Sequence, residues 1–293
     1  MLALARFILA SRARAALVAC AGNLLPLLSP ATVALVALRH GGREGALVAL
    51  WSVLPLVVML YTGGVAPALV WASLLTVAVV MVAATALRST SSWQLALLAL
   101  VAASAAAALG MGQVLTTEVS ALGLELKAMF VQMLAARGQR WDPDATLVLG
   151  LLAWVMAVSA LGGLLLGRWW QALLYNPGGL GREFRGLRLQ PSLALVLMAG
   201  LVGSQLGPVS YAAWGNLSGL PLFMSGLALV HHLVAASPRV GAHWLAVFYV
   251  CLVLLLGPLG LLLTGLGFID SLIDLRARFG RRGGDLDRPH RDR

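Results

Sequence analysis

The sequence is poor in charge. Asp, Glu, Lys and Arg together make up 11% of its 293 residues, whereas soluble globular chains carry about 25%. Acidic residues are the scarcest, with 11 Asp and Glu against 21 Lys and Arg, and none lies inside the long apolar runs. The chain therefore leaves out the buried carboxylates that proton- or sodium-driven carriers use for coupling. A soluble globular fold is excluded, and an ion-driven carrier is disfavoured.

Cysteines and catalytic motifs are also scarce. The two cysteines, Cys20 and Cys251, lie far apart in apolar runs, so the sequence predicts neither a disulfide framework nor a metal site. There is no His-Glu-x-x-His motif and no Walker A motif. Ser218 and His243 could form a serine–histidine pair, but Asn216 stands where the Gly-x-Ser-Gly context of an intramembrane protease needs glycine. We expect no enzyme, no metal and no cofactor.

What the sequence does have is apolar length. Hydrophobic residues make up 60% of the chain, and the mean hydropathy is +0.90. A membrane-spanning helix needs about 20 mostly apolar residues, and runs of this kind recur from end to end. The sequence therefore predicts an all-α, polytopic transmembrane helix bundle of about eight spans. We place these spans at residues 15–38, 46–61, 68–87, 93–115, 145–166, 191–206, 212–235 and 242–266.

An amphipathic helix is expected at residues 119–136, between the fourth and fifth spans. Polar residues recur there every seven positions on one face, and Leu and Met side chains form the opposite face. If this helix crossed the membrane, Glu125 would lie at the middle of the bilayer, so we expect it on the surface. We treat residues 1–282 as a single transmembrane domain and expect residues 283–293 to be a disordered basic tail.

The N-terminal segment has two interpretations. Leu17-Val18-Ala19-Cys20 matches a bacterial lipobox, and arginines precede it as in a signal peptide. Only five apolar residues separate Arg14 from Cys20, fewer than the roughly 7–15 of a signal h-region. The apolar run also continues to Leu38. We therefore expect residues 15–38 to be an uncleaved first span.

The net charge of +10 lies at span edges and in the tail. This distribution is typical of membrane orientation and binding to anionic lipids rather than to nucleic acid. With eight spans, both termini face one side, which collects thirteen Lys and Arg residues against eight on the other. The positive-inside rule then places both termini in the cytoplasm. It leaves the arginine-rich loop at residues 182–188 outside, so either one span is miscounted or that loop has a specific role.

The end of the last span carries Asp270, Asp274 and Arg278, four residues apart. On a helix these side chains share one face with acid before base, which favours i, i+4 pairing. A solvated helix end anchored at the cytoplasmic surface also explains the pattern.

This segment is one of several that resemble a known family. The sequence resembles the YybS-like predicted bacterial membrane proteins, a family whose domain has no established function. The segments that carry the resemblance are Leu266–Asp270 with Asp274-Leu275-Arg276, Tyr175–Gly179 with Glu183-Phe184 and Leu187–Leu189, and Asn216–Gly226 leading to His231. It covers the whole chain, with its sharpest motifs after residue 170.

The resemblance implies an S-component-like core, since the family is similar to the substrate-binding S components of energy-coupling-factor transporters. Six helices would enclose a pocket open to the outside, and a transmembrane coupling subunit would connect it to an ATPase module. Ala15 and Ala19 would face the coupling subunit. The polar side chains expected in the pocket are Gln205, Trp214, Asn216, Ser218 and His231.

The sequence leaves two functions open. The first is a bacterial inner-membrane protein that binds or transports a small molecule. The second is a non-transporting scaffold or assembly factor that binds a protein partner or anionic lipid. Its contacts would be the 119–136 helix, the basic tail and the loop that carries Arg182, Arg185 and Arg188. A polar-lined cavity between spans favours the first function, and a solidly packed bundle favours the second.

Overall fold

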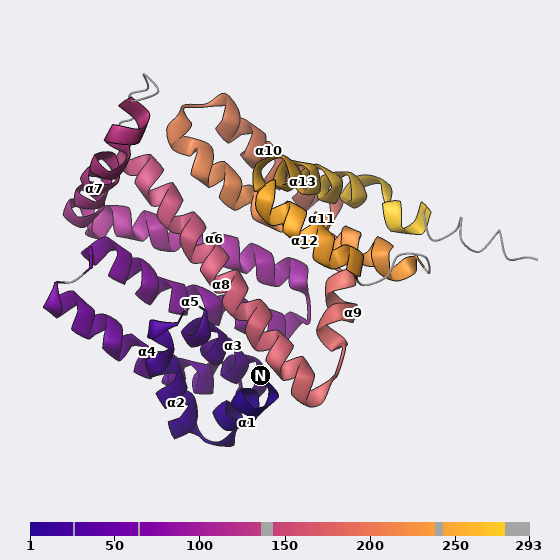
Figure 1. Ribbon diagram of the computed structural model, residues 1–293, viewed down its shortest axis with the longest axis horizontal. Helices are drawn as coiled ribbons and strands as arrows, with labels where there is room; N and C mark the ends of the chain where they lie inside the picture. The colour runs from indigo at the N-terminus through magenta and orange to yellow at the C-terminus, as the bar shows by residue number, and fades with distance from the viewer. Residues whose placement is uncertain (26, 64, 136–142, 238–242, 279–293) are drawn as a thin grey trace, which may run out of the picture. The chain divides into compact units, whose positions relative to one another are not determined.

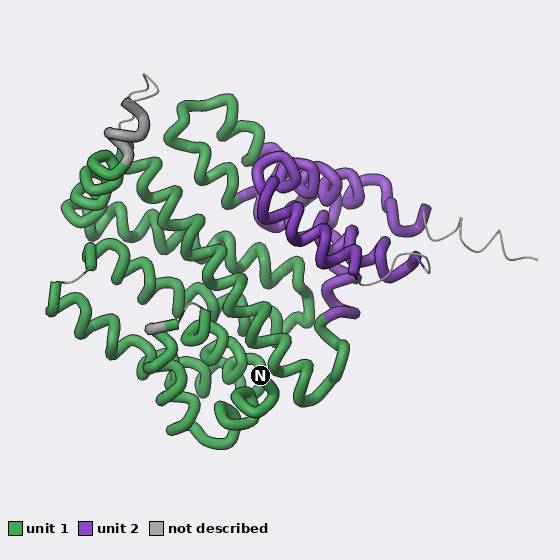
Figure 2. The backbone as a smooth tube through the Cα atoms, in the orientation of Figure 1, with its two compact units in different colours: residues 1–180, 201–217 green, residues 181–200, 218–293 purple. Residues whose placement is uncertain are grey.

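The computed structural model describes residues 1–278 except residues 26, 64, 136–142 and 238–242. The described residues form helices joined by short turns, and they include no strand, which confirms the all-α prediction (Figure 1). The chain divides into two compact units (Figure 2). Unit 1 comprises residues 1–180 and 201–217, and unit 2 comprises residues 181–200 and 218–293. The expected tail at residues 283–293 lies outside the described part of the chain.

Unit 1 contains the first eight α-helices. They are α1 (Leu2–Ala10), α2 (Arg12–Ala21), α3 (Leu28–His40), α4 (Gly42–Thr62), α5 (Pro67–Thr90), α6 (Trp93–Val114), α7 (Thr116–Ala135) and α8 (Ala145–Tyr175), with the 3-10 helix η1 (Gly22–Leu24) after α2. Four long apolar helices, α4, α5, α6 and α8, coincide with expected spans, and α7 coincides with the expected amphipathic helix. Local signals set their ends: Pro67 occupies the first turn of α5, and Asp144 Oδ1 accepts the Leu147 N–H at 2.8 Å to cap α8.

The expected continuous span at residues 15–38 is wrong, because this segment forms two short helices around an irregular tip. α2 ends at Ala21, η1 follows, and α3 begins at Leu28. Pro30 lies in the first turn of α3, where its missing N–H has no helical acceptor to lose. At about 1.5 Å per residue, α2 and α3 are about 15 and 20 Å long, well short of a hydrocarbon core of about 30 Å.

These two helices begin and end at the same end of unit 1. Arg12, the first residue of α2, donates to Glu44 Oε1 at 2.6 Å, and Glu44 lies in the first turn of α4, directly after α3. At the tip, Asn23 Nδ2 donates to the Ser52 carbonyl, midway along α4, at 2.8 Å. The segment α2–η1–α3 is therefore a hairpin that reaches about halfway along α4 and returns. We call it the N-terminal hairpin.

The end of unit 1 where this hairpin starts is rich in arginine. Arg88, at the end of α5, donates to the carbonyls of Leu38 and Arg39. The Arg39 guanidinium lies 4.1 Å from the ring centre of Tyr175, the last residue of α8. The ends of α3, α5 and α8 therefore meet here, and we call this region the basic end of unit 1.

Unit 2 contains most of α9 (Gly179–Arg185), all of α12 (His243–Leu254) and α13 (Leu256–Ile273), and parts of α10 (Pro191–Leu206) and α11 (Ala212–Ala236), which the 3-10 helix η2 (Val209–Tyr211) precedes. α10 and α11 coincide with expected spans. α11 and α13 cross at two glycines, where their backbones touch. A Cβ atom on Gly226 would clash with the Leu263 carbonyl, and one on Gly267 would clash with the Leu222 carbonyl. Close approach of this kind is typical of membrane helix pairs.

The expected continuous span at residues 242–266 is also wrong. Leu255, with φ −119° and ψ 38°, separates α12 from α13. α12 has 12 residues, about 18 Å, too few to cross a bilayer. α12 and α13 contact each other and double back in Figure 1. We call them the C-terminal hairpin.

The C-terminal hairpin returns to the arginine-rich segment that follows α8. Arg188 Nη1 lies 2.9 Å from Asp274 Oδ2, and Arg276 Nη2 donates to the Leu187 carbonyl at 2.5 Å. The ring centre of Phe184 lies 5.3 Å from that of His231, near the end of α11. Of the two explanations left open for the 182–188 loop, these contacts favour a miscounted span, because they join the loop directly to the C-terminal segment.

Six segments of the described chain are long and apolar enough to cross a membrane. They are α4, α5, α6, α8, α13 and the segment Val209–Ala236, while α10 and α12 are apolar but shorter. These six segments make the chain a multi-pass membrane protein by length and composition.

Candidate functional site

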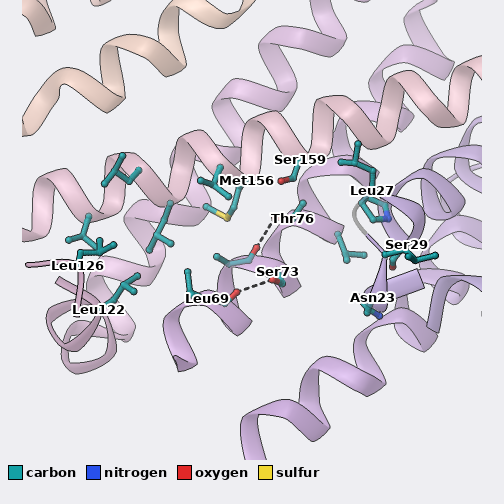
Figure 3. Close-up of a pocket in the computed structure, with 18 of the residues that line it drawn as sticks. Asn23, Leu27, Ser29, Leu69, Ser73, Thr76, Leu122, Leu126, Met156 and Ser159 are labelled. Carbon is teal, nitrogen blue, oxygen red and sulfur yellow. Dashed lines mark hydrogen bonds between the residues drawn. The ribbon is translucent and has the colours of Figure 1, made fainter. Parts of the chain in front are cut away.

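Unit 1 holds a cavity of about 630 Å³ at the tip of the N-terminal hairpin (Figure 3). This volume lies within the roughly 300–1,000 Å³ of small-molecule sites. Its walls come from the hairpin tip, α5, α7 and α8. Most of the lining side chains are Leu, Val, Met and Ala, and the polar ones are Asn23, Ser29, Ser73, Thr76, Glu125 and Ser159.

Hydrogen bonds and close backbone packing fix the tip. Asn23 Nδ2 lies 3.2 Å from the Cys20 carbonyl as well as 2.8 Å from that of Ser52, so it joins the end of α2 to α4. A Cβ atom on Gly22 would lie 2.8 Å from the Ser29 backbone nitrogen. A larger residue at position 22 would therefore push α2 away from α3.

α8 supports the other side of the tip. Leu27 adopts a left-handed conformation, with φ 65°, which is rare for leucine and needs support from its surroundings. Its side chain packs over Gly162, where a Cβ atom would lie 3.0 Å from the leucine methyl carbons. At the next residue, a Cβ atom on Gly163 would lie 2.7 Å from Pro30. The two glycines therefore let α8 approach the tip closely enough to hold it.

The hydroxyl groups of the cavity differ in their hydrogen bonds. Ser73 Oγ donates to the Leu69 carbonyl at 2.9 Å, and Thr76 Oγ1 donates to the Ala72 carbonyl at 2.8 Å. Ser29 Oγ is buried and has no partner among the described residues. Among the described lining residues, Ser29 therefore carries the one fully buried hydroxyl without a hydrogen-bond partner, and it lies at the hairpin tip (Figure 3).

The cavity is open at several points, since the lining residues Leu25, Leu69, Ser73 and Val155 are exposed. Another opening lies at α7. Leu122 is buried, and Leu126 is half-buried beside it (Figure 3). Glu125 and Met129 also line the cavity but are exposed. α7 therefore covers the cavity with an apolar face and leaves a carboxylate at its rim.

The five residues predicted for the pocket do not line this cavity. In unit 1, Gln205 and Asn216 are exposed, and Trp214 Nε1 donates to the Thr146 carbonyl at 2.9 Å. In unit 2, Ser218 Oγ donates to the Leu197 carbonyl at 3.3 Å, and His231 Nε2 lies 2.7 Å from Tyr249 Oη. They are divided between the units and have separate local contacts.

The alanine pair predicted to face a coupling subunit lies inside unit 1. Ala15 is 2% exposed and Ala19 is fully buried, because α2 packs against α3 and α4 over this face. The prediction is therefore not met, since a partner cannot reach either side chain.

Unit 2 contains a network of arginines and carboxylates around the end of α13. Asp270 is fully buried, and its Oδ2 lies 2.9 Å from Arg276 Nε. Arg276 also donates to the carbonyls of Arg185 and Leu187, both at 2.5 Å. Arg188 donates to the Asp270 carbonyl at 2.9 Å and pairs with Asp274. These bonds fasten the C-terminal hairpin to the segment after α9.

The predicted i, i+4 pairing of Asp270, Asp274 and Arg278 is wrong. The helix ends at Ile273, and Asp274 has a left-handed conformation with φ 49°, so the three side chains do not share one helix face. Arg278 is exposed. Arg276 takes the place predicted for Arg278. The turn at Asp274 brings Arg276, six positions beyond Asp270, back to the Asp270 carboxylate.

Arg182, Arg185 and Arg188 lie around one groove, although α9 ends at Arg185 and Arg188 is outside the helix. Together with Arg276, Asp274, His232 and Gly186 they line an open groove of about 470 Å³ in unit 2. Arg188 and Arg276 are held by carboxylates, so part of the cluster's charge is neutralised inside the chain.

The residues that sequence reasoning missed are Ser29 and Arg276. A serine in an apolar run gives no signal by itself, because most such hydroxyls bond to their own helix. Comparison of the chain with family models, with curated proteins and with solved structures finds no match.

Proposed function

We propose that the chain is an integral protein of the bacterial inner membrane that binds a small, mostly apolar molecule in the unit 1 cavity. The carrying observation is the cavity of about 630 Å³ at the tip of the N-terminal hairpin. In a membrane, non-helical backbone is tolerated only where protein buries it or where it lines a cavity. The irregular tip meets this condition because it lines the cavity. The cavity therefore explains why the chain is non-helical at this point.

The proposed topology has six crossings, made by α4, α5, α6, α8, α10 and α11, with both hairpins and both termini on the cytoplasmic side. It differs from the six long apolar segments at one place: α13 does not cross, because it doubles back on α12, and the shorter α10 crosses instead. Eighteen of the 21 Lys and Arg residues then belong to the cytoplasmic side. The other three, Lys127, Arg137 and Arg140, belong to the connection between α6 and α8. This division agrees with the positive-inside rule better than the thirteen-to-eight division of eight straight spans.

In this topology α7 lies at the outer surface, since it follows an outward crossing and precedes an inward one. The opening of the cavity beside Glu125 then faces outward, and we place ligand entry at this opening. An outward-open pocket supports the resemblance to S components. Transport would require a coupling subunit and an ATPase module, because the sequence has no Walker A motif. The coupling surface would lie elsewhere than at the buried Ala15 and Ala19.

A second candidate function is a scaffold that binds anionic lipid or a protein partner. The observation that favours it is the groove of unit 2 with its four arginines. Arginine recognises phosphate and carboxylate groups through paired donors. In the proposed topology this groove faces the cytoplasmic leaflet, where anionic lipids lie.

Native mass spectrometry of the purified full-length protein tests the first proposal. We expect a co-purified small molecule in the wild type and its loss in Ser159→Trp, because an indole at this position on α8 fills the cavity. The matched control is Val158→Trp, at the neighbouring position. The Val158 side chain is 43% exposed and does not line the cavity. Bound lipid at the arginine groove with no ligand sensitive to Ser159→Trp supports the scaffold instead.

A further inference from the structure

One polar atom at the cavity has no use inside the chain. Among the described residues, four buried side-chain atoms lack hydrogen-bond partners, on Ser29, Ser104, Trp170 and Ser225. Of these residues, only Ser29 lines the cavity. Its side chain is 2% exposed, and it lies beside Asn23 and Leu27 at the hairpin tip (Figure 3). A buried hydroxyl without a partner is unfavourable, so a retained one calls for an explanation.

The position of Ser29 in α3 explains why it is unpaired. Serine and threonine inside apolar helices usually donate to the carbonyl four residues earlier, as Ser73 and Thr76 do in the same cavity. Ser29 is the second residue of α3, so the carbonyl four residues before it belongs to Leu25, outside the helix. That carbonyl accepts the Leu28 N–H instead. The irregular tip therefore leaves this hydroxyl without a partner in the chain, at a residue that lines the cavity.

The start of α3 also sets which partner the hydroxyl prefers. The N-terminal end of a helix carries a partial positive charge from its aligned peptide dipoles. An oxygen acceptor placed there is favoured by that charge and by the Ser29 hydroxyl as donor. A cationic group is disfavoured at the same place.

The lining residues decide between a charged and a neutral acceptor. No Lys or Arg is among the described residues that line the cavity, and the one carboxylate, Glu125, is at the rim. A buried anion without a cationic partner is strongly unfavourable. A neutral carbonyl oxygen satisfies the donor without bringing an unpaired charge.

We propose that the tip of the N-terminal hairpin binds the carbonyl oxygen of a neutral, largely apolar molecule, with the Ser29 hydroxyl as donor. Ketones, quinones, esters and amides belong to this ligand class. Ser159, half-buried on α8, lines the same cavity. The inference rests on the proposed function and specifies its ligand.

Four probes with one ring system separate the possibilities. 2-Acetylnaphthalene carries a neutral carbonyl, 2-ethylnaphthalene is its hydrocarbon match, 2-naphthoate is anionic and 2-naphthylmethylammonium is cationic. Their affinities are measured by naphthalene fluorescence with the full-length protein in lipid nanodiscs. A probe that occupies the cavity should bind more weakly to Ser159→Trp, because the indole fills the same space. Circular dichroism checks that each variant is folded.

The wild type should bind the ketone about fivefold more tightly than the hydrocarbon, the usual size of one net hydrogen bond. Ser29→Ala should remove this preference and leave hydrocarbon binding unchanged. Ser73→Ala is the matched control, because its hydroxyl is already bonded to the Leu69 carbonyl, and it should keep the preference. The carbonyl stretch of the bound ketone should lie at lower frequency in the wild type than in Ser29→Ala.

The outcomes separate this inference from the proposed function. Equal binding of ketone and hydrocarbon, both lost in Ser159→Trp, overturns the carbonyl site and keeps the cavity as a binding site. Preference for the naphthoate or the ammonium probe overturns the neutral ligand class. If no probe binds in a Ser159-dependent way, the inference and the proposed function both fail.

Discussion

The two hairpins differ in the polarity of their tips. The N-terminal hairpin has polar groups at its tip, where Asn23 is bonded to α4 and Ser29 lines the cavity, as well as at its base, where Arg12 is paired with Glu44. The C-terminal hairpin has an apolar tip, with Leu255 52% exposed. Its polar groups lie at the base, where the buried Asp270 is paired with Arg276.

We attribute this difference to function. The tip of the N-terminal hairpin serves ligand binding, whereas the base of the C-terminal hairpin serves stability. At the base of the C-terminal hairpin, Asp270 is paired with Arg276 and Asp274 with Arg188, so these pairs stabilise unit 2. The tip of the N-terminal hairpin keeps an unpaired hydroxyl, which makes the empty site less stable than it could be. Natural proteins tolerate such local losses of stability where function needs them.

The largest effect is expected from breaking the base of the C-terminal hairpin. Asp270→Asn leaves the Arg276 guanidinium, which is only 10% exposed, without its carboxylate. Removing one partner of a buried ion pair costs roughly 3–5 kcal/mol, so we expect the free energy of unfolding to fall by about 3 kcal/mol. Chemical denaturation of the protein in detergent measures it.

Asp274→Asn is the matched control for this change. Its pair with Arg188 is partly exposed, with side chains 43% and 32% accessible, and such pairs contribute about 0–1 kcal/mol. Equal losses in the two variants would show that burial does not govern this network.

The second effect comes from separating α11 and α13. Gly267→Ala places a methyl group against the Leu222 carbonyl, and overpacking of this kind costs about 1–3 kcal/mol. Gly265→Ala on the same helix meets nothing within 4 Å and should be neutral or slightly stabilising, since alanine favours helix. Melting temperatures of the two variants check this, and a stable Gly267→Ala protein would contradict the crossing.

The third effect concerns the attachment of the N-terminal tip. Asn23→Ala removes the bond to the Ser52 carbonyl, so we expect a loss of about 1 kcal/mol in stability. Binding in the cavity should weaken more than stability does, because the displaced tip carries Ser29. Ligand affinity and thermal unfolding are measured on the same preparation. Full affinity in a destabilised Asn23→Ala protein would count against the tip as part of the site.

The smallest effect has opposite signs in the two hairpins. Ser29→Ala removes an unpaired buried hydroxyl, so the ligand-free protein should gain up to about 1 kcal/mol. Ser271→Ala removes a buried hydroxyl that donates to the Gly267 carbonyl at 2.7 Å, so it should lose about 1 kcal/mol. Thermal unfolding of the two variants without ligand tests the contrast, and losses of similar size would remove it.

The length of the apolar runs predicted the all-α class and the long helices α4, α5, α6 and α8, because each is an uninterrupted run of sufficient length. It failed at residues 15–38 and 242–266, since hydropathy measures how much apolar chain there is and not whether the chain turns back. A signal for the first hairpin was present. Arginines flank both ends of the first run, at Arg12 and Arg39, which is typical of a segment that returns to one side.

The site was less predictable than the fold. The polar residues within spans predicted a site at Gln205, Trp214, Asn216, Ser218 and His231. Trp214 and Ser218 instead donate to backbone carbonyls, and His231 bonds to Tyr249. The unpaired state of Ser29 follows from where α3 begins, and that boundary depends on packing of the tip against α8. The pairing of Asp270 with Arg276 depends on the left-handed turn at Asp274.

The most direct measurement of the hairpin topology is labelling of single cysteines by an impermeant maleimide in membrane vesicles of both orientations. After replacement of Cys20 and Cys251, cysteines are introduced at the exposed positions Ser11, Arg43 and Thr62. The N-terminal hairpin predicts that positions 11 and 43 are labelled from the cytoplasmic side and position 62 from the other side. Labelling of positions 11 and 43 from opposite sides would mean that residues 15–38 cross the membrane, which contradicts the hairpin.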